Sequence, residues 1–225
     1  MEWRTLLSVE PSPNPMALDR LTIAERDRDT TDLDLVLAES WTLLELGARR
    51  ASESFHMGVL ANWDGMMCQQ RTLVLRVADA LRRQLICHTD ARAPKLHGLR
   101  AYPRVSWLFY DPSRKLQLRL AGTARIHGDD SLADLRWAAS TLSARRCYLS
   151  HSPPGTLAPV PTSGLTAPFI NRSPTEDESH RGRRNFAAVV TEIDEVECLH
   201  LDALGHRRAR FRWVDGVWTG DWLVP

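Results

Sequence analysis

Polar residues within otherwise apolar segments are the features of this sequence most suited to chemistry. The segment Arg71–Arg76 places an arginine at each end of an alternating apolar run. This alternation predicts a strand on which Arg71 shares one face with two leucines, while Thr72, Val74 and Arg76 share the other. Such a strand could bind an anion or line a ligand site. An arginine on a strand can equally be a solvated surface residue.

A second polar group stands where a strand is expected to end. His88 and Thr89 close the apolar segment 84–89, and Lys95 follows within a short helix expected over 91–101. A strand that leads into a helix N-terminus presents free backbone N–H groups, which bind anions. A hydroxyl and an ammonium close by would complete a phosphate site. The alternative is that Lys95 is an ordinary exposed helix lysine.

Two further segments combine polar and apolar residues. Gln117 alternates with leucines, and its amide can both donate and accept hydrogen bonds, as the edge of a heterocycle requires. The segment 205–213 contains four arginines, among them Arg207, Arg208 and Arg210. Gln117 could instead be a cross-strand partner, and the arginines could form a solvated edge strand that resists aggregation.

Several well-defined motifs are missing from the sequence. It has no glycine-rich dinucleotide motif after a strand, no P-loop, no HExxH and no GxSxG. His200 and His206 lack a matching cysteine or carboxylate pattern. We therefore expect no metal site.

Composition restricts the class of protein. The chain has 225 residues, of which 43% are hydrophobic and 25% charged, as in an ordinary globular domain. Its 29 basic and 28 acidic residues give a net charge of +1, which argues against a nucleic-acid partner. The apolar runs are too short to span a membrane. Four cysteines without a CxxC pair, and no secretory leader, predict a reducing, cytoplasmic location.

The hydrophobic periodicity predicts a mainly β protein with peripheral helices (α+β). Helices are expected at 32–50, 91–101 and 130–149. Strands are expected at 57–62, 68–77, 84–89, 104–110, 115–127, 186–193, 196–202, 206–213 and 217–224. Short strands separated by turn residues favour a closed or partly closed antiparallel barrel.

The domain organisation follows from where this pattern stops. Residues 1–29 are interrupted by prolines and charges and are interpreted as an N-terminal arm. Residues 30–225 form a single domain. Six of the thirteen prolines fall in 150–185, a segment without sustained periodicity, which predicts a covering loop.

Four segments, taken in order, resemble a known family. RTLVLR, ICHTDARAPK, RVSWLFYDPSRKLQLRLAG and EVECLHLDALGHRRARF are similar to the pyridoxamine 5′-phosphate oxidase family of FMN-binding split β-barrels. The resemblance runs from about residue 33 to the C-terminus. It implies a split antiparallel β-barrel, a homodimer with FMN bound between the subunits, and an FMN-dependent oxidoreductase that acts on a small-molecule substrate.

The resemblance also implies roles for individual residues. Arg71 and Lys95 correspond to bases that bind the FMN phosphate, and Gln117 to a glutamine that contacts the flavin. His88 takes the place of a family tyrosine. The full cofactor-binding set is Arg71, Thr72, Val74, Arg76, His88, Thr89, Lys95, Gln117 and Arg210.

The substrate site of the family is less well matched. A family arginine that grips the substrate phosphate aligns with Ser143, and a family histidine aligns near Ala209. Arg207 and Arg208 remain as candidate substrate residues. The cofactor site is therefore largely kept and the family's substrate site is not. A flavin oxidoreductase of unknown substrate is favoured, and the alternatives are a true pyridoxine or pyridoxamine 5′-phosphate oxidase, or a non-catalytic flavin- or haem-binding protein.

Overall fold

A computed structural model describes residues 31–225, so the arm expected at 1–29 lies outside the described residues. The first element is helix α2, Leu33–Arg49, which confirms the helix expected at 32–50. Its apolar face buries Trp41, Leu43 and Leu44 in the main core. Burial of such a stripe, rather than intrinsic propensity, is what stabilises a helix in a protein.

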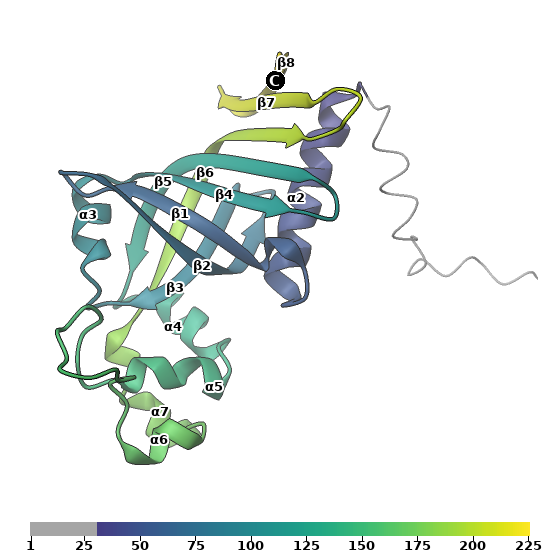
Figure 1. Cartoon of the computed structure of the whole chain (residues 1–225). Coiled ribbons are helices and arrows are strands. Elements are labelled where there is room, and N and C mark those ends of the chain that lie inside the picture. Colours follow the sequence, from purple (N-terminus) through teal and green to yellow (C-terminus); the bar gives the residue numbers. More distant parts are fainter. Residues whose placement is uncertain (1–30) are drawn as a thin grey trace, which may run out of the picture. The chain divides into compact units, whose positions relative to one another are not determined.

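Six strands close into an antiparallel barrel (Figure 1). The hydrogen-bonded order is β3-β2-β1-β4-β5-β6, and an additional β3–β6 pairing closes the ring. The strands are β1 Met57–Trp63, β2 Cys68–Asp79, β3 Gln84–Asp90, β4 Arg104–Asp111, β5 Leu116–His127 and β6 Phe186–His200. A short 3-10 helix, Ser54–His56, precedes β1. This architecture is the split-barrel class that the sequence predicts.

Alternation along the strands fills the barrel. In β5, Leu116, Leu118 and Leu120 are buried, while the residues between them are exposed or half-buried. In β4, the stacked rings of Trp107 and Phe109 have their centroids 5.7 Å apart. This period of two is the pattern that identifies a strand with one buried face.

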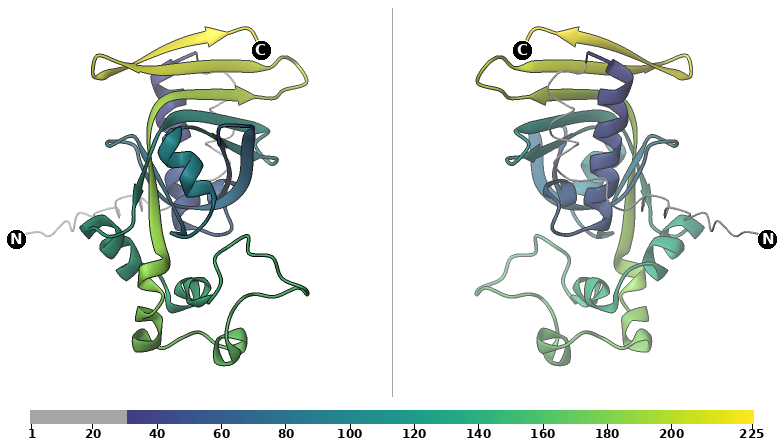
Figure 2. Two further views of the ribbon diagram at one scale, coloured as in Figure 1. Left: turned by 90° about the vertical axis from the view of Figure 1, so that its left-hand side faces the viewer. Right: turned by 90° about the vertical axis from the view of Figure 1, so that its right-hand side faces the viewer.

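Strand β6 differs from the prediction, because the strands expected at 186–193 and 196–202 are one continuous strand. The register with its partner β5 shifts between Ala121 and Gly122, where Asp194 of β6 is the extra, unpaired residue of a bulge. A Cβ on Gly122 would lie 2.1 Å from the carbonyl oxygen of Glu192, so only glycine permits this close approach. Figure 2 shows β6 running from the short helices at one end of the barrel to the C-terminal hairpin at the other.

The C-terminal hairpin extends the sheet beyond the barrel. It consists of β7, Arg207–Val214, and β8, Val217–Leu223. The intervening Asp215 and Gly216 have φ values of 52° and 83°, as expected for the tight turn that an Asp-Gly pair favours.

Several short helices follow the strands. They are α3 Lys95–Ala101, α4 Ser131–Ala138, α5 Leu142–Arg145, a 3-10 turn Arg146–Leu149, α6 Ala167–Asn171, α7 Glu176–His180 and a 3-10 turn Arg183–Asn185. Helix α3 packs against β5 and β1, whereas α4 packs against β6 and the remaining helices lie near it at the end opposite the hairpin (Figure 1). The segment expected to lack regular structure, 150–185, therefore contains short helices from residue 167 onward. These helices are too short for hydrophobic periodicity to reveal them.

A second, smaller core lies beneath α4. Trp137, Tyr148 and Phe186 pack edge to face, with ring centroids 5.1–5.8 Å apart. Arg145 is 4% exposed, and its guanidinium donates to the carbonyl oxygens of Trp137 and Ala138, each at 3.1 Å. These contacts fix the segment 131–149 that becomes one wall of the site described below.

Two observations concern the chain as a whole. Within residues 31–225, no helix is both long and apolar enough to cross a membrane. None of the four cysteines is in a disulfide.

Candidate functional site

Two adjoining pockets lie where β2 and β3 meet the short helices. The larger has a volume of about 760 Å³ and lies between the end of β3 and the segment 147–164. The smaller, of about 250 Å³, lies between the outer face of β2 and the α4–α5 region. His88, Cys147 and Tyr148 line both pockets, so the two pockets share a wall.

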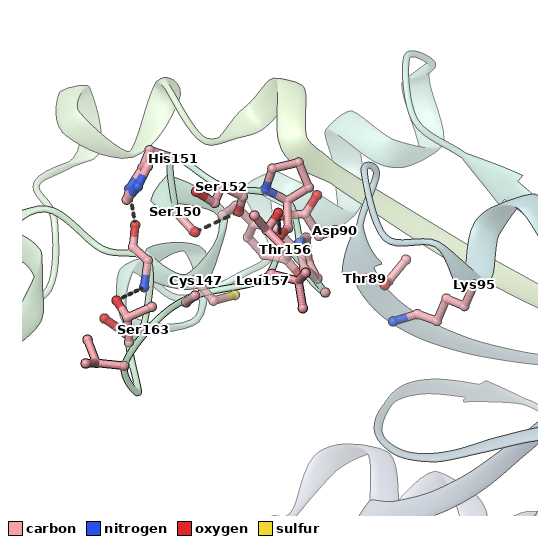
Figure 3. A pocket seen from close by; sticks show the side chains of 18 of the residues that line it. Thr89, Asp90, Lys95, Cys147, Ser150, His151, Ser152, Thr156, Leu157 and Ser163 are labelled. Atoms are coloured by element: carbon pink, nitrogen blue, oxygen red, sulfur yellow. Dashed lines mark hydrogen bonds between the residues drawn. The ribbon is translucent and has the colours of Figure 1, made fainter.

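Thr89 and Lys95 form the polar end of the larger pocket (Figure 3). Thr89 is only 5% exposed, and its Oγ1 has no hydrogen-bond partner. Burial, and then the charge of Arg71, lower the pKa of the Lys95 ammonium. A buried hydroxyl without a partner is costly, so this pair is suited to an acceptor that a ligand would supply.

Arg71 lies on the inward face of β2 and lines neither pocket. Its Nη1 donates to Asn62 Oδ1 and, at 3.4 Å, to the carbonyl oxygen of Leu60. It is nevertheless close enough to Lys95 to lower the pKa of that lysine. Among residues 31–225, neither Arg71 nor Lys95 forms an ion pair with a carboxylate. The two side chains thus form a positive region without a direct ion pair, and the carboxylates of Asp90 and Asp64 act on it only from farther away.

The expected helix N-terminus contributes less than the sequence suggested. Helix α3 begins only at Lys95, and the N–H groups of Leu96 and His97 donate to the carbonyl oxygens of Ala93 and Pro94, both at 3.0 Å. These N–H groups are therefore not free to bind an anion. The polar end of the pocket is built from side chains instead.

The smaller pocket brings together predicted residues from both strands. Thr72, Val74 and Arg76 line one wall, and His88 from β3 stands beside them. His88 Nε2 is buried without a hydrogen-bond partner, and the ring lies edge-on to Phe186 with centroids 4.8 Å apart. Burial, followed by the charges of Arg76 and Arg136, lowers the pKa of His88 to about 4. His88 is therefore neutral at pH 7.

The opposite wall contains residues that the sequence analysis did not single out. They are Ser140, Ala144, Cys147 and Tyr148. Ser140, Ala144 and Cys147 recur at intervals of four and three residues, the spacing of one helical face, which is the signal that could have identified them, although the structure divides this segment into α5 and a 3-10 turn. Ser143, which aligned with a family arginine, is exposed and is not among the residues lining the pocket; Ala144 faces the pocket in its place.

The segment that covers the larger pocket is anchored at both ends. The Arg92 guanidinium donates to the carbonyl oxygens of Ser150, at 3.1 Å, and His151, at 3.4 Å. Arg92 is itself held by Asp90, with an Nη2–Oδ2 distance of 2.7 Å. The backbone N–H of His151 donates to the carbonyl oxygen of Gly164 at 3.1 Å, so the intervening residues form a closed loop.

Gln117 and Arg210 do not join this site within one chain. The strand registers place Thr72, Arg119 and Arg210 in one row on the outer face of the sheet, through β1, β4 and β6. Strands are spaced about 4.8 Å apart, so Gln117 on β5, three strands from β2 in either direction around the barrel, is roughly 14 Å from the Thr72 strand, measured along the sheet. Arg210 lies on β7, outside the barrel. Neither lines either pocket.

Arg207 and Arg208 also lie outside the pockets. Arg208 Nη2 is 2.9 Å from Glu197 Oε2, and the Arg207 guanidinium lies over Trp222, 5.1 Å from the ring centroid. Both residues are on β7, at the far end of the sheet from β2. The structure therefore does not bring these two predicted substrate residues to the β2–β3 site of the same chain.

Comparison with known proteins matches the fold and one region of the sequence. Residues 39–128 match the family model described as the pyridoxamine 5′-phosphate oxidase, FMN-binding domain. The chain is similar to the structure of a pyridoxamine 5′-phosphate oxidase-related, FMN-binding protein from Nostoc punctiforme, with a TM-score of 0.66 and 22% identity over 84% of this chain and 96% of that one. No curated protein matches.

A second solved structure has a comparable similarity. PhzG from Burkholderia lata, in complex with tetrahydrophenazine-1-carboxylic acid, superposes with a TM-score of 0.63 and 18% identity, covering 89% of this chain and 96% of that one. At these identities the structural matches identify the fold, and the sequence match at 39–128 identifies the domain.

Proposed function

Because residues 39–128 of this chain belong to the FMN-binding domain family of pyridoxamine 5′-phosphate oxidase, we propose that the protein is a flavoprotein oxidoreductase acting on a small molecule. FMN is the cofactor of the matched domain. When bound, it supplies hydride and electron transfer, while the protein supplies binding, orientation and electrostatics. Fold alone does not name the substrate.

The observation that carries this proposal is the set of donors at the polar end of the larger pocket. Among the described residues, Thr89 Oγ1 has no hydrogen-bond partner and neither Lys95 nor the nearby Arg71 forms an ion pair, although Asp90 and Asp64 act on these two cations from farther away. A phosphate monoester supplies the acceptors and the negative charge that such a set requires. Hydrogen bonds to charged groups are worth about 1.5–3 kcal/mol each, so these residues fit the FMN phosphate.

The adjoining small pocket fits the ring of the cofactor. Thr72 and Val74 present an outward strand face, and the unpaired Nε2 of neutral His88 offers one hydrogen bond at its margin. In this role His88 would orient the ring, and Tyr148 and the 150–164 loop would exclude water. In this proposal one ligand extends past the wall that the two pockets share, with its phosphate at Lys95 and its ring against Thr72 and Val74.

We further propose a homodimer in which Gln117 and Arg210 reach the flavin bound by a second copy. Their positions support this, because Gln117 lies across the barrel from β2, Arg210 lies on β7 outside the barrel, and neither lines a pocket of its own chain. Met57, Leu108 and Tyr110 lie on the same outer face and are 38–48% exposed, which suits an apolar interface. A cytoplasmic location is proposed because none of the four cysteines is in a disulfide.

The absorbance spectrum of the purified protein, before and after addition of FMN, tests the cofactor assignment. We expect flavin bands that co-elute with the protein, and bleaching of these bands when a reductant or substrate donates electrons. A haem-type band with no affinity for FMN would replace the proposal by the tetrapyrrole-binding alternative.

A second candidate function is pyridoxine or pyridoxamine 5′-phosphate oxidase itself, which the matched domain favours. Against it, Ala144 rather than an arginine faces the small pocket, and Ala209 occupies the late histidine position. Buried Arg145 does not compensate, because Glu176, Ser179 and two backbone carbonyls occupy its guanidinium. Steady-state assays that release hydrogen peroxide distinguish the two. A kcat/KM in the usual enzyme range of about 10⁴–10⁸ M⁻¹s⁻¹ with these phosphates would establish the second candidate.

A further inference from the structure

The loop that covers the larger pocket is held by an arginine that does not itself line the pocket. We propose that Arg92 is a positioning residue for the cofactor: it fastens the loop 150–164 to Asp90 at the end of β3 and thereby slows the release of FMN. The inference rests on the proposed function, which places the FMN phosphate at Lys95, beneath this loop.

Arg92 and Asp90 form a rigid, mostly buried pair. The Asp90 carboxylate accepts hydrogen bonds from the backbone N–H of Arg92 at 2.8 Å, from its Nε at 2.9 Å and from its Nη2 at 2.7 Å. The Asp90 and Arg92 side chains are 9% and 24% exposed. Two parallel bonds between a guanidinium and a carboxylate fix the plane of the guanidinium. The remaining N–H groups of Arg92 are therefore aimed in one direction.

That direction is toward the base of the loop. Nη2 of Arg92 donates to the carbonyl oxygen of Ser150 at 3.1 Å, and Nη1 donates to that of His151 at 3.4 Å. The loop closes at the same place, because the backbone N and the Nδ1 of His151 lie 3.1 and 2.7 Å from the carbonyl oxygen of Gly164. A Cβ on Gly164 would lie 2.3 Å from Ser150 Oγ, so the two ends of the loop are in close contact. Arg92 therefore holds both ends of the loop at one point.

Beyond its base, the loop is held only weakly over the pocket. It reaches the residue before Lys95, since a Cβ on Gly155 would lie 3.6 Å from Pro94 Cγ. Among residues 31–225, the hydrogen bonds of residues 153–163 join only positions within three residues of one another. None of these loop residues carries a charge that could form an ion pair. The position of the loop therefore depends on its base, and so on Arg92.

The same pair stands beside the phosphate end of the pocket. Thr89 precedes Asp90 on β3, and Thr89, Asp90 and Lys95 all line the larger pocket (Figure 3). Arg92 is not among the lining residues, so it acts on the cofactor through Asp90 and the loop rather than by contact. Its charge also offsets the Asp90 carboxylate, which would otherwise repel a phosphate in the same pocket. Loss of Arg92 thus has two separable consequences, a loosened loop and an unpaired carboxylate.

The rate of FMN release tests the role of the loop. Release is followed from the recovery of flavin fluorescence after dilution, and association from stopped-flow quenching. We expect Arg92→Gln to release FMN about tenfold faster. Arg82→Gln is the matched control, because Arg82 is held by Asp79 in the same way, with an Nη1–Oδ2 distance of 2.8 Å, but lies outside both pockets. It should leave both rates unchanged.

Two further variants separate the loop from the charge. The double variant Asp90→Asn, Arg92→Gln removes the pair without leaving an unpaired carboxylate, and it should still release FMN about tenfold faster, with no slower association. It carries the same test if Arg92→Gln alone does not fold. Replacing residues 153–161 by Gly-Gly removes the cover itself. FMN release should then be equally fast, and adding Arg92→Gln should accelerate it no further.

The outcomes are distinguishable from failure of the proposed function. FMN is first compared with riboflavin in the unmodified protein, and equal affinities would overturn the phosphate assignment and this inference with it. Where FMN is preferred, an unchanged release rate in Arg92→Gln, or slow release restored in the double variant, would overturn the role of the loop. A further tenfold acceleration by Arg92→Gln in the shortened protein would show that Arg92 acts directly on the phosphate, which would also overturn it.

Discussion

Burial, and then the guanidinium of Arg71, lower the pKa of the Lys95 ammonium, although the two side chains approach from different elements, strand β2 and helix α3. Like charges brought close together destabilise the free protein. The same arrangement is favourable once an anion lies between or beside them. The relationship therefore links the stability of the free protein to phosphate binding.

FMN affinity should fall as the pH rises through the pKa of Lys95, which lies below the ordinary lysine value of 10.5. The sign follows because the phosphate binds the protonated amine, and deprotonation removes that attraction. In the free protein, the lowered pKa of Lys95 has the opposite effect. The free energy of unfolding rises with pH until the pH reaches the pKa of Lys95 in the unfolded chain. Fluorescence titration of FMN between pH 7 and pH 10 measures this, with Lys95→Arg as the control that should titrate much less. A flat profile in the unmodified protein would contradict it.

Arg145→Ala should lower the free energy of unfolding by about 2–4 kcal/mol, because it removes a buried guanidinium that satisfies two backbone carbonyls and binds Glu176. Urea denaturation measures the change. The adjacent Arg146→Ala is the matched control and should cost much less. Equal effects of the two substitutions would show that the Arg145 network does not support the segment 131–149.

Much of the barrel could be predicted because its strands alternate cleanly. The leucines of β5 and the Asp-Gly turn at 215–216 are local signals, and the structure has the strand and turn they predict. The long β6 could not be recognised from its own sequence. It remains one strand because Gly122 of the neighbouring β5 lets the two backbones approach closely. The helices α6 and α7 were missed because five residues are too few to show a helical period.

Leu108→Glu should dissociate the proposed dimer and weaken FMN binding at the same time. Leu108 is 38% exposed on the outer sheet face, in the same row as Thr72 and Arg119, so a carboxylate there would be buried in the interface. Sedimentation velocity measures the mass, and Leu157→Glu, at a 99% exposed position of the loop, is the control. A stable FMN-loaded monomer of the unmodified protein would refute the dimer.

Limited proteolysis should cut first within 150–164 and more slowly when FMN is bound. The segment has no regular structure over most of its length and reaches full exposure at Leu157, while its anchors at Ser150 and Gly164 border the larger pocket. Mass spectrometry of the first fragments identifies the sites. First cuts inside 68–127, or rates unaffected by FMN, would contradict the covering role.

The site could be predicted only where its residues share a strand or a short segment. Thr72, Val74, Arg76 and His88 do meet at one pocket, and Thr89 and Lys95 at the next. On the helical wall, the sequence comparison pointed to Ser143, whereas Ala144 lines the pocket. An error of one residue matters here because successive side chains of a helix point about 100° apart. Arg207 and Arg208 lie on β7, away from these pockets. The sequence alone does not determine which strands pair, so it could not show that these two residues are separated from the site.

The most direct test of the account compares FMN with riboflavin, which lacks only the phosphate. Affinities of both are measured by fluorescence quenching for the unmodified protein, for Lys95→Gln, and for Lys115→Gln, which removes the other, exposed lysine of the chain. We expect FMN to bind far more tightly than riboflavin, and Lys95→Gln to reduce that preference about tenfold or more, while Lys115→Gln leaves it intact. Equal affinities for FMN and riboflavin in the unmodified protein, or a preference unchanged by Lys95→Gln, would contradict the assignment of this pocket to the flavin phosphate.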